Sequence, residues 1–212
     1  MRENIIITKY CKVANNEIIV NGEVVFSSES NLTFSEFVKE AYKFKAMAYP
    51  KFYKMDNLSK LGTIATEFLS DELNCENVNG DEIGIILMNS ASSLDTDKNF
   101  QNTINDKDNY FPSPAVFVYT LPNIVIGEIC IKHKIFGDTA FFVSEKFDVG
   151  FIYDMVGDLI LNQGLKIVIT GWVDFIDNEY TAILCVVKNI ENSNNNNNEI
   201  TKFTIESLKR LF

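Results

Sequence analysis

Short apolar runs alternate with polar turns over the first 26 residues of the chain. The apolar residues are concentrated at positions 5–7, 18–20 and 24–26, and Asn21-Gly22 separates the last two runs. Both residues of an Asn-Gly pair tolerate positive φ, which the tight turn of a β-hairpin requires. The pattern therefore predicts an N-terminal β-hairpin.

A helical period follows the hairpin and recurs along the chain. Thr33 and Glu36 have the spacing of a capping box, and apolar residues then repeat at helical intervals from Phe34 to Tyr42. Apolar stripes mark two further helices, with Gly164 placed to end the second, Pro122-Asn123 opens another, and a short helix ends the sequence. These four are predicted at residues 55–73, 123–134, 149–163 and 204–212.

Strands are predicted between these helices. Residues 83–88 are apolar on both faces, which is typical of a central parallel strand. Further strands are expected at 139–144, 166–172 and 180–187, the last after the turn Asp177-Asn178. Alternating strands and helices predict an α/β fold with a mixed, mostly parallel sheet of about five strands and helices on both faces. We see no repeat and expect one domain over residues 1–212, with a solvated Asn-rich loop at 191–199.

Net charge and residue composition exclude several classes of partner and site. The 212 residues carry a net charge of -10, which argues against nucleic acid or an anionic membrane as a partner. No apolar run approaches the roughly 18 residues of a membrane span, and no secretory signal is evident, so we expect a cytoplasmic protein. The four cysteines form no CxxC pair and favour reduced core thiols, and the single histidine offers no metal site. We predict neither a metal nor a cofactor.

Three small motifs have a functional and a plain interpretation. Cys130 and His133 could share a helix face as a catalytic pair, although a packed helix is the simpler interpretation. The small-residue loop 90–93 could hold a phosphate through its amides, but it has no glycine-rich turn and no basic residue. Residues 95–97 resemble the start of a calcium loop without its glycine and final glutamate. In each case we favour the structural interpretation.

Four segments together carry a family resemblance. They are residues 49–62, which include Tyr49-Pro50, residues 83–97, residues 113–129, which include Leu121-Pro122-Asn123, and residues 164–171. In this order and spacing they resemble the N-terminal half of the β-ketoacyl-acyl carrier protein synthases, members of the thiolase superfamily. The resemblance spans about residues 49–175 and implies a thiolase-like half-domain and an acyltransferase family active in fatty-acid, polyene or polyketide synthesis.

The departures from that family bear on catalysis. The resemblance implies a nucleophilic cysteine at the start of a buried helix, about nine residues after a Gly-Pro pair. Here Gly137-Asp138 replaces that pair, and the expected position falls at Ser144, Glu145, Lys146 and Phe147, none of which is a cysteine. The family's two catalytic histidines would come from a C-terminal half, which this sequence does not contain. The resemblance therefore predicts the scaffold without its catalytic residues.

Two functions remain open. The first is a non-catalytic, ketosynthase-like partner subunit of the chain-length-factor kind. The second is a 3-oxoacyl-acyl carrier protein synthase component that is active only with residues from another chain. Because the chain is acidic, as carrier proteins are, we expect any contact with acyl carrier protein to be indirect, through the partner.

The half-domain also predicts an interface. The helix at 149–163 would expose an apolar stripe when the second half is absent, and the strand at 139–144 would offer a flat apolar edge. We therefore expect an obligate homodimer, or a heterodimer with a complete ketosynthase. The predicted interface residues are Phe141, Phe142, Val143, Ile152, Val156, Leu159 and Ile160.

Overall fold

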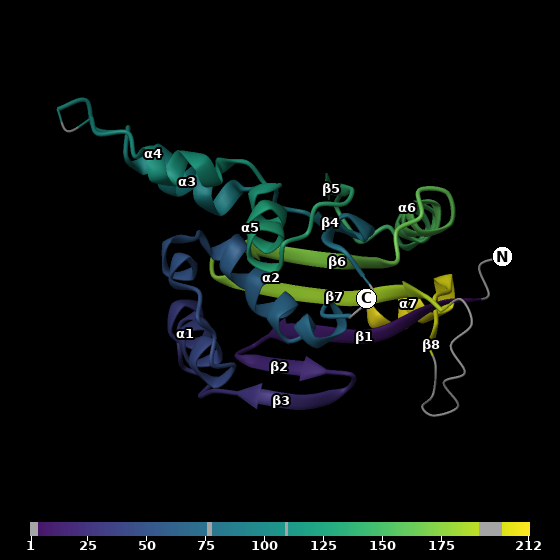
Figure 1. Ribbon diagram of the computed structural model, residues 1–212. Coiled ribbons are helices and arrows are strands. Elements are labelled where there is room, and N and C mark those ends of the chain that lie inside the picture. Colours follow the sequence, from purple (N-terminus) through teal and green to yellow (C-terminus); the bar gives the residue numbers. More distant parts are fainter. Residues whose placement is uncertain (1–3, 76–77, 109, 191–200) are drawn as a thin grey trace.

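A computed structural model describes residues 4–75, 78–108, 110–190 and 201–212. In these residues one eight-stranded sheet has the order β3-β2-β1-β7-β6-β4-β5, and β8 pairs with β1 beside this path (Figure 1). The strands are β1 (Ile5–Ala14), β2 (Glu17–Val20), β3 (Glu23–Ser27), β4 (Ile83–Asn89), β5 (Thr139–Val143), β6 (Ile167–Ile176), β7 (Glu179–Asn189) and β8 (Thr201–Lys202). The loop predicted at 191–199 lies outside the described residues.

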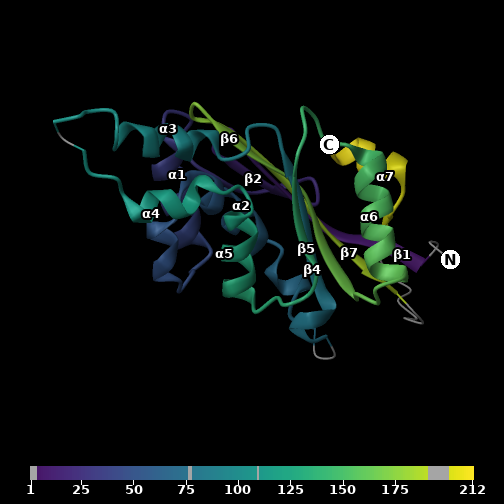
Figure 2. The same ribbon diagram turned by 90° about the horizontal axis from the view of Figure 1, so that it is seen from above.

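The helices lie on both faces of this sheet (Figure 2). They are α1 (Phe34–Phe44), α2 (Asn57–Glu67), α3 (Leu94–Asn102), α4 (Pro114–Phe117), α5 (Ile124–His133), α6 (Val149–Leu161) and α7 (Ile205–Leu211). Short 3-10 helices are η2 (Pro50–Lys54), η3 (Ser70–Glu72), η4 (Gly80–Glu82) and η5 (Val118–Thr120). One core cluster packs α1, α2 and α5 on one face of the sheet, and a second packs α6 and α7 on the other. The predicted mixed sheet with helices on both faces is confirmed.

The share of parallel pairing differs from the prediction. In the described residues only the pairings of β4 with β5 and with β6 are parallel, and the other pairings are antiparallel. A parallel pair needs a long crossover, whereas β6 and β7 are joined by the tight turn at Asp177 and Asn178, which have φ of 50° and 67°. That turn makes the pair an antiparallel hairpin. The sheet therefore has more strands, and fewer parallel ones, than the alternation of helices and strands predicts.

Several local predictions are confirmed. Asn21 and Gly22 adopt φ of 50° and 88° in the turn between β2 and β3. Thr33 and Glu36 form both hydrogen bonds of a capping box at the start of α1. Gly164 adopts φ of 79° after α6, which is the conformation that ends many helices.

Helix α2 packs closely on α5 because it carries a glycine at the crossing. A Cβ atom added to Gly62 would lie 2.4 Å from Cγ2 of Val125, so the helices could not approach this far with a larger residue. The crossing fixes α5, and with it the start of the connection to β5.

One segment projects from the body of the protein. The segment that contains α3 and α4 projects away from the sheet in both views (Figures 1 and 2).

In the described part of the chain, no single helix is long and apolar enough to cross a membrane, and only the bent pair Pro114–Thr120 and Ile124–His133 meets the length and composition test.

Candidate functional site

The connection from β5 to α6 holds the position at which the family resemblance predicts a nucleophile. Ser144 continues β5 and donates its amide to the carbonyl of Asn89 at 2.9 Å. Glu145 and Lys146 are exposed. The side chain of Asp148 caps α6 by accepting a hydrogen bond from the amide of Phe151 at 3.0 Å. A carboxylate of the chain itself therefore occupies the helix N-terminus, where it would repel a thiolate or an oxyanion.

An aromatic cluster fills the same region. The ring of Phe147 stacks on that of Phe212, with 3.7 Å between centroids, and meets Trp172 edge-on at 6.4 Å. Phe147 is thus partly buried against the second core cluster. The pattern of residues 144–147 gives no hint of this packing, because Phe212 is distant in sequence.

None of the four cysteines lies at this position. Burial raises the pKa of Cys11 and of Cys185 to about 12, and that of Cys130 to about 11. Such thiols remain protonated near neutral pH and are poor nucleophiles. Cys75 follows η3, close to residues that the structure does not describe.

The possible pair of Cys130 and His133 is not an activated one. Nε2 of His133 lies 3.7 Å from Oε2 of Glu67, and Lys132 forms an ion pair with the same oxygen. Burial, reinforced by the charge of Lys132, lowers the pKa of His133 to about 4. No hydrogen bond joins the imidazole to the Cys130 sulfur, and the structure supports a packed helix.

The small-residue loop after β4 has its polar groups satisfied internally. Asp174 of β6 accepts hydrogen bonds from Ser90 Oγ and from the Ala91 amide, the latter at 3.1 Å. The Ser92 amide donates to Asn89 Oδ1 at 3.0 Å. Because carboxylate and amide oxygens already occupy these donors, the loop is not a phosphate cradle.

A cluster of polar side chains lies where α2, α3 and η5 meet. Thr96 donates to Asp56 at 2.8 Å, and Asn57 donates to Asp95 at 3.1 Å. Burial raises the pKa of Asp56 and of Asp95, although hydrogen bonds oppose the shift. A cavity of about 300 Å³ adjoins this cluster, and Tyr119 also lines it. Residues 95–97 belong to α3 and not to a calcium loop.

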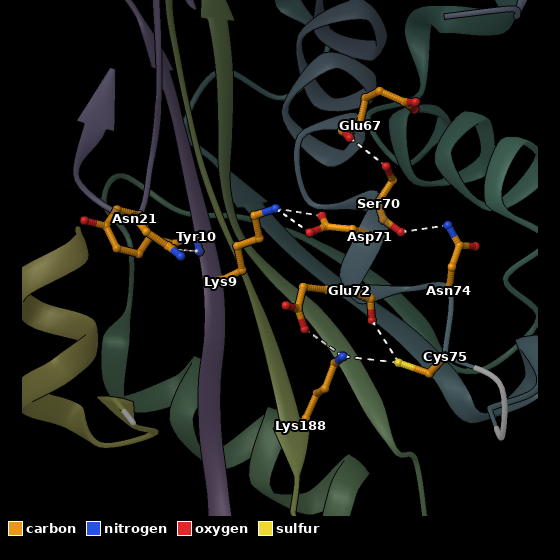
Figure 3. Close-up of polar contacts among 10 residues, drawn as sticks. All are labelled: Lys9, Tyr10, Asn21, Glu67, Ser70, Asp71, Glu72, Asn74, Cys75 and Lys188. Carbon is orange, nitrogen blue, oxygen red and sulfur yellow. Dashed lines mark hydrogen bonds and ion pairs between the residues drawn. The ribbon is translucent and has the colours of Figure 1, made fainter. Parts of the chain in front are cut away.

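A second polar cluster attaches η3 to the sheet (Figure 3). Lys9 of β1 contacts Asp71 at 2.7 Å, and Lys188 of β7 contacts Glu72 at 2.7 Å and the sulfur of Cys75 at 3.3 Å. These contacts hold the end of the α2 segment against two strands. No group of three or more His, Cys, Asp or Glu side chains in the described residues could hold a metal ion.

The comparisons agree on the architecture alone. No family model matches the sequence, and no curated protein does. A ketosynthase in complex with its chain length factor from Xenorhabdus doucetiae matches with a TM-score of 0.55 and 13% identity, over 87% of this chain and 79% of that chain. The ishigamide ketosynthase/chain length factor matches with a TM-score of 0.60 and 14% identity, over 90% of this chain and 63% of that chain.

A β-ketoacyl synthase from Burkholderia phymatum matches with a TM-score of 0.58 and 10% identity, over 88% of this chain and 59% of that chain. The chain has a thiolase-like fold. It spans less than two thirds of the length of two of these three structures. At such low identity the likeness establishes the thiolase-like architecture and leaves activity and partners to be argued from the site.

In this thiolase-like chain, one half of the predicted interface is corrected. Ile152, Val156, Leu159 and Ile160 are buried within the chain, at 0%, 0%, 7% and 4% exposure. They pack against the sheet in the second core cluster, so the expectation that a single chain leaves them in water is wrong. The outer side of α6 carries Asp154 and Asp158 together with Phe151 and Leu161, which are exposed by 37% and 38%.

The other half of the predicted interface lies on an open edge of the thiolase-like sheet. In the described residues β5 pairs only with β4, which leaves its outer main-chain groups free. Phe141 and Phe142 are half-buried on opposite faces of the sheet, and Val143 is 54% exposed. The edge is therefore accessible to a further strand.

Proposed function

We propose that this protein is a non-catalytic, ketosynthase-like subunit that assembles with a complete ketosynthase, in the manner of a chain length factor in polyketide, polyene or fatty-acid synthesis. The observation that carries the proposal is that the β5–α6 connection lacks the groups a ketosynthase uses for catalysis. On a thiolase-like scaffold it has no thiol at residues 144–147. It also has Asp148 on the helix N-terminus and Phe147 packed under Phe212.

The chemistry of condensation explains why these three features matter together. Acyl transfer to a cysteine needs a thiolate beside free amide donors, which stabilise the negative oxygen of the tetrahedral intermediate. Here one amide donor at the start of α6, that of Phe151, is bound to the Asp148 carboxylate, and the aromatic ring of Phe147 packs beside it against Trp172 and Phe212. The two features block the same site independently, so restoring the cysteine alone would not restore the reaction.

The open β5 edge supports assembly. On this strand Val143 is 54% exposed, and Phe151, whose ring meets that of Phe142 at 4.7 Å, is 37% exposed, which makes an apolar border along an unpaired strand. An unprotected edge of this kind pairs readily with a strand of another chain. Solved structures of this architecture include ketosynthases in complex with a chain length factor, which favours a ketosynthase as the partner over a second copy of this chain.

The alternative function, an acyltransferase completed by another chain, requires a reactive thiol near α6. Cys130 lies on α5, and burial raises its pKa to about 11. Cys11 and Cys185 are buried in the two core clusters. A covalent acyl adduct on any of the four cysteines after incubation with an acyl carrier substrate and the partner would favour this alternative.

The experiment that tests the proposal is light scattering on this protein mixed with complete ketosynthases from the same genome. We expect a mixed complex of one copy of each chain. The variant Val143→Asp should weaken that complex by about 10-fold or more, because a buried unpaired charge opposes strand pairing. Val24→Asp is the matched control, since Val24 is 55% exposed on β3, the strand at the opposite edge of the sheet.

A homodimer that ignores every ketosynthase would contradict the proposal. An equal effect of the two substitutions would also contradict the assignment of the interface to β5. In an assay of the partner's condensation activity, the assembled complex should retain activity when all four cysteines of this chain are replaced by serine.

A further inference from the structure

A cavity of about 360 Å³ lies on the side of the sheet opposite the Lys9–Asp71 pair. Strand β1 forms its floor, Asn21 of the β2–β3 turn forms one wall, and Ser207, Arg210 and Leu211 of α7 form the other. Its volume is within the range of small-ligand pockets. It is separate from the β5–α6 connection and from the β5 edge.

A bulge in β1 shapes the floor of this cavity. The register of β1 against β7 shifts between Ile7 and Lys9, so that the side chains after the bulge change faces. Figure 3 shows the result: Lys9 points to Asp71 on one side, and the ring of Tyr10 points to the other side, toward α7. The cavity therefore receives a tyrosine hydroxyl and not the lysine amine.

Three of the polar side chains that line the cavity have donors without a partner among the described residues, whereas Thr8 and Lys9, which also line it, are bonded to Val186 and Asp71. Oδ1 of Asn21 accepts from the Tyr10 amide at 2.9 Å, which leaves the Asn21 amide nitrogen as a donor. The Tyr10 hydroxyl and the Arg210 guanidinium have no hydrogen bond or ion pair with the described residues, and Ser207 shares one hydrogen bond with Thr204. Three elements thus present free donors to one space.

The charge of the lining is unusual for this protein. The chain has 29 acidic and 19 basic residues, yet none of the described residues that line the cavity is acidic. Arg210 is one of only two arginines in the sequence. Guanidinium groups bind phosphate through two parallel hydrogen bonds, which a lysine cannot reproduce.

We propose that this cavity, here named the β1–α7 cavity, binds the phosphate group of a small molecule. Arg210 would hold two oxygens, while Tyr10 and Asn21 donate to the others. A tetrahedral anion suits donors that converge from three directions better than a planar carboxylate with two oxygens. Ile7 and Leu211 add an apolar surface for the rest of a phosphate ester. The proposal does not depend on the proposed function as a ketosynthase partner.

The test is a titration of the isotope-labelled full chain with sodium phosphate, followed by amide chemical shifts, with sodium chloride at equal ionic strength as the reference. We expect shifts concentrated at Tyr10, Asn21 and Arg210. Arg210→Gln should weaken binding by about 10-fold. Lys209→Gln is the matched control, because Lys209 is exposed on the same helix, loses the same charge and does not line the cavity.

Tyr10→Phe removes one donor and keeps the ring, so it should weaken binding while leaving the thermal unfolding midpoint unchanged. A second titration with glycerol 3-phosphate identifies the source: tighter binding assigns a phosphate ester, and equal binding assigns the free anion. The proposal is overturned if phosphate shifts the amide signals of residues elsewhere, or if the two charge variants weaken binding equally. It is also overturned if no amide signal shifts at about 10 mM phosphate, a concentration well above the dissociation constant of a weak specific site.

Discussion

Acidification should destabilise this protein through its single histidine. His133 ends α5 with its side chain only 10% exposed, and burial and Lys132 lower its pKa to about 4 from an ordinary value of 6.5. Between these two values the unfolded chain binds a proton that the folded chain does not. The free energy of unfolding therefore rises with pH in this window and falls as the solution is made more acidic.

The size of the effect follows from the two pKa values. With 6.5 in the unfolded chain and about 4 in the folded chain, His133 should remove about 2 kcal/mol of stability between pH 7 and pH 5. The full difference between the two pKa values corresponds to about 3 kcal/mol, which is the upper bound at lower pH. Carboxyl groups also titrate as the pH falls, and a matched variant must isolate the histidine.

Urea unfolding of the wild type and of His133→Asn at pH 7, 6 and 5 is the direct assay. The wild type should lose about 2 kcal/mol more than the variant over this range. Because the chain has one histidine, its imidazole proton signal can be followed by NMR without assignment. An imidazole midpoint at or above 6.5, or equal pH dependence in the two proteins, would refute the reasoning.

Three further predictions concern packing and capping. Thr170 Oγ1 is buried without a partner in the described residues, so Thr170→Val should raise the free energy of unfolding by about 1 kcal/mol in urea titrations, and a loss would contradict this account. Gly62→Ala should cost about 1–3 kcal/mol because its Cβ would meet Val125, and Val125→Ala should recover part of that loss in the double variant. Asp148→Ala should lower the free energy of unfolding by about 1 kcal/mol through loss of the α6 cap, whereas Asp148→Asn should stay near wild type; equal losses would exclude the capping role.

Local sequence signals predict much of this fold. The capping box at Thr33 and Glu36 and the turn at Asn21 and Gly22 involve residues within a few positions of each other, so their geometry is visible in the sequence. The buried strand β4 is also predicted well, since the consecutive apolar residues at 83–88 are typical of a strand that is covered on both faces. The pairing of strands is not, because hydrogen bonds between distant segments leave no local periodic signal.

In the candidate site, too, local features can be predicted from the sequence and contacts between distant residues cannot. The absence of a thiol at residues 144–147 can be read from the sequence. The stacking of Phe147 on Phe212 cannot, because it joins two residues far apart in the chain. The apolar stripe of α6 is visible in the sequence, but periodicity cannot tell whether that stripe packs on the chain's own sheet or on another half-domain, and it packs on the chain's own sheet.

The position of β1 in the sheet constrains the order in which the chain can fold. The first strand lies between β2 and β7, and Ile5 pairs with Asn189. The β1–β3 meander can form as soon as it leaves the ribosome, but its inner edge stays open until residue 189 has been synthesised. Contacts this distant in sequence slow folding and expose strand edges to other chains during that interval. A nascent chain of this protein therefore carries an unpaired β1 edge until β7 has emerged, and in that interval the edge can pair with strands of other chains.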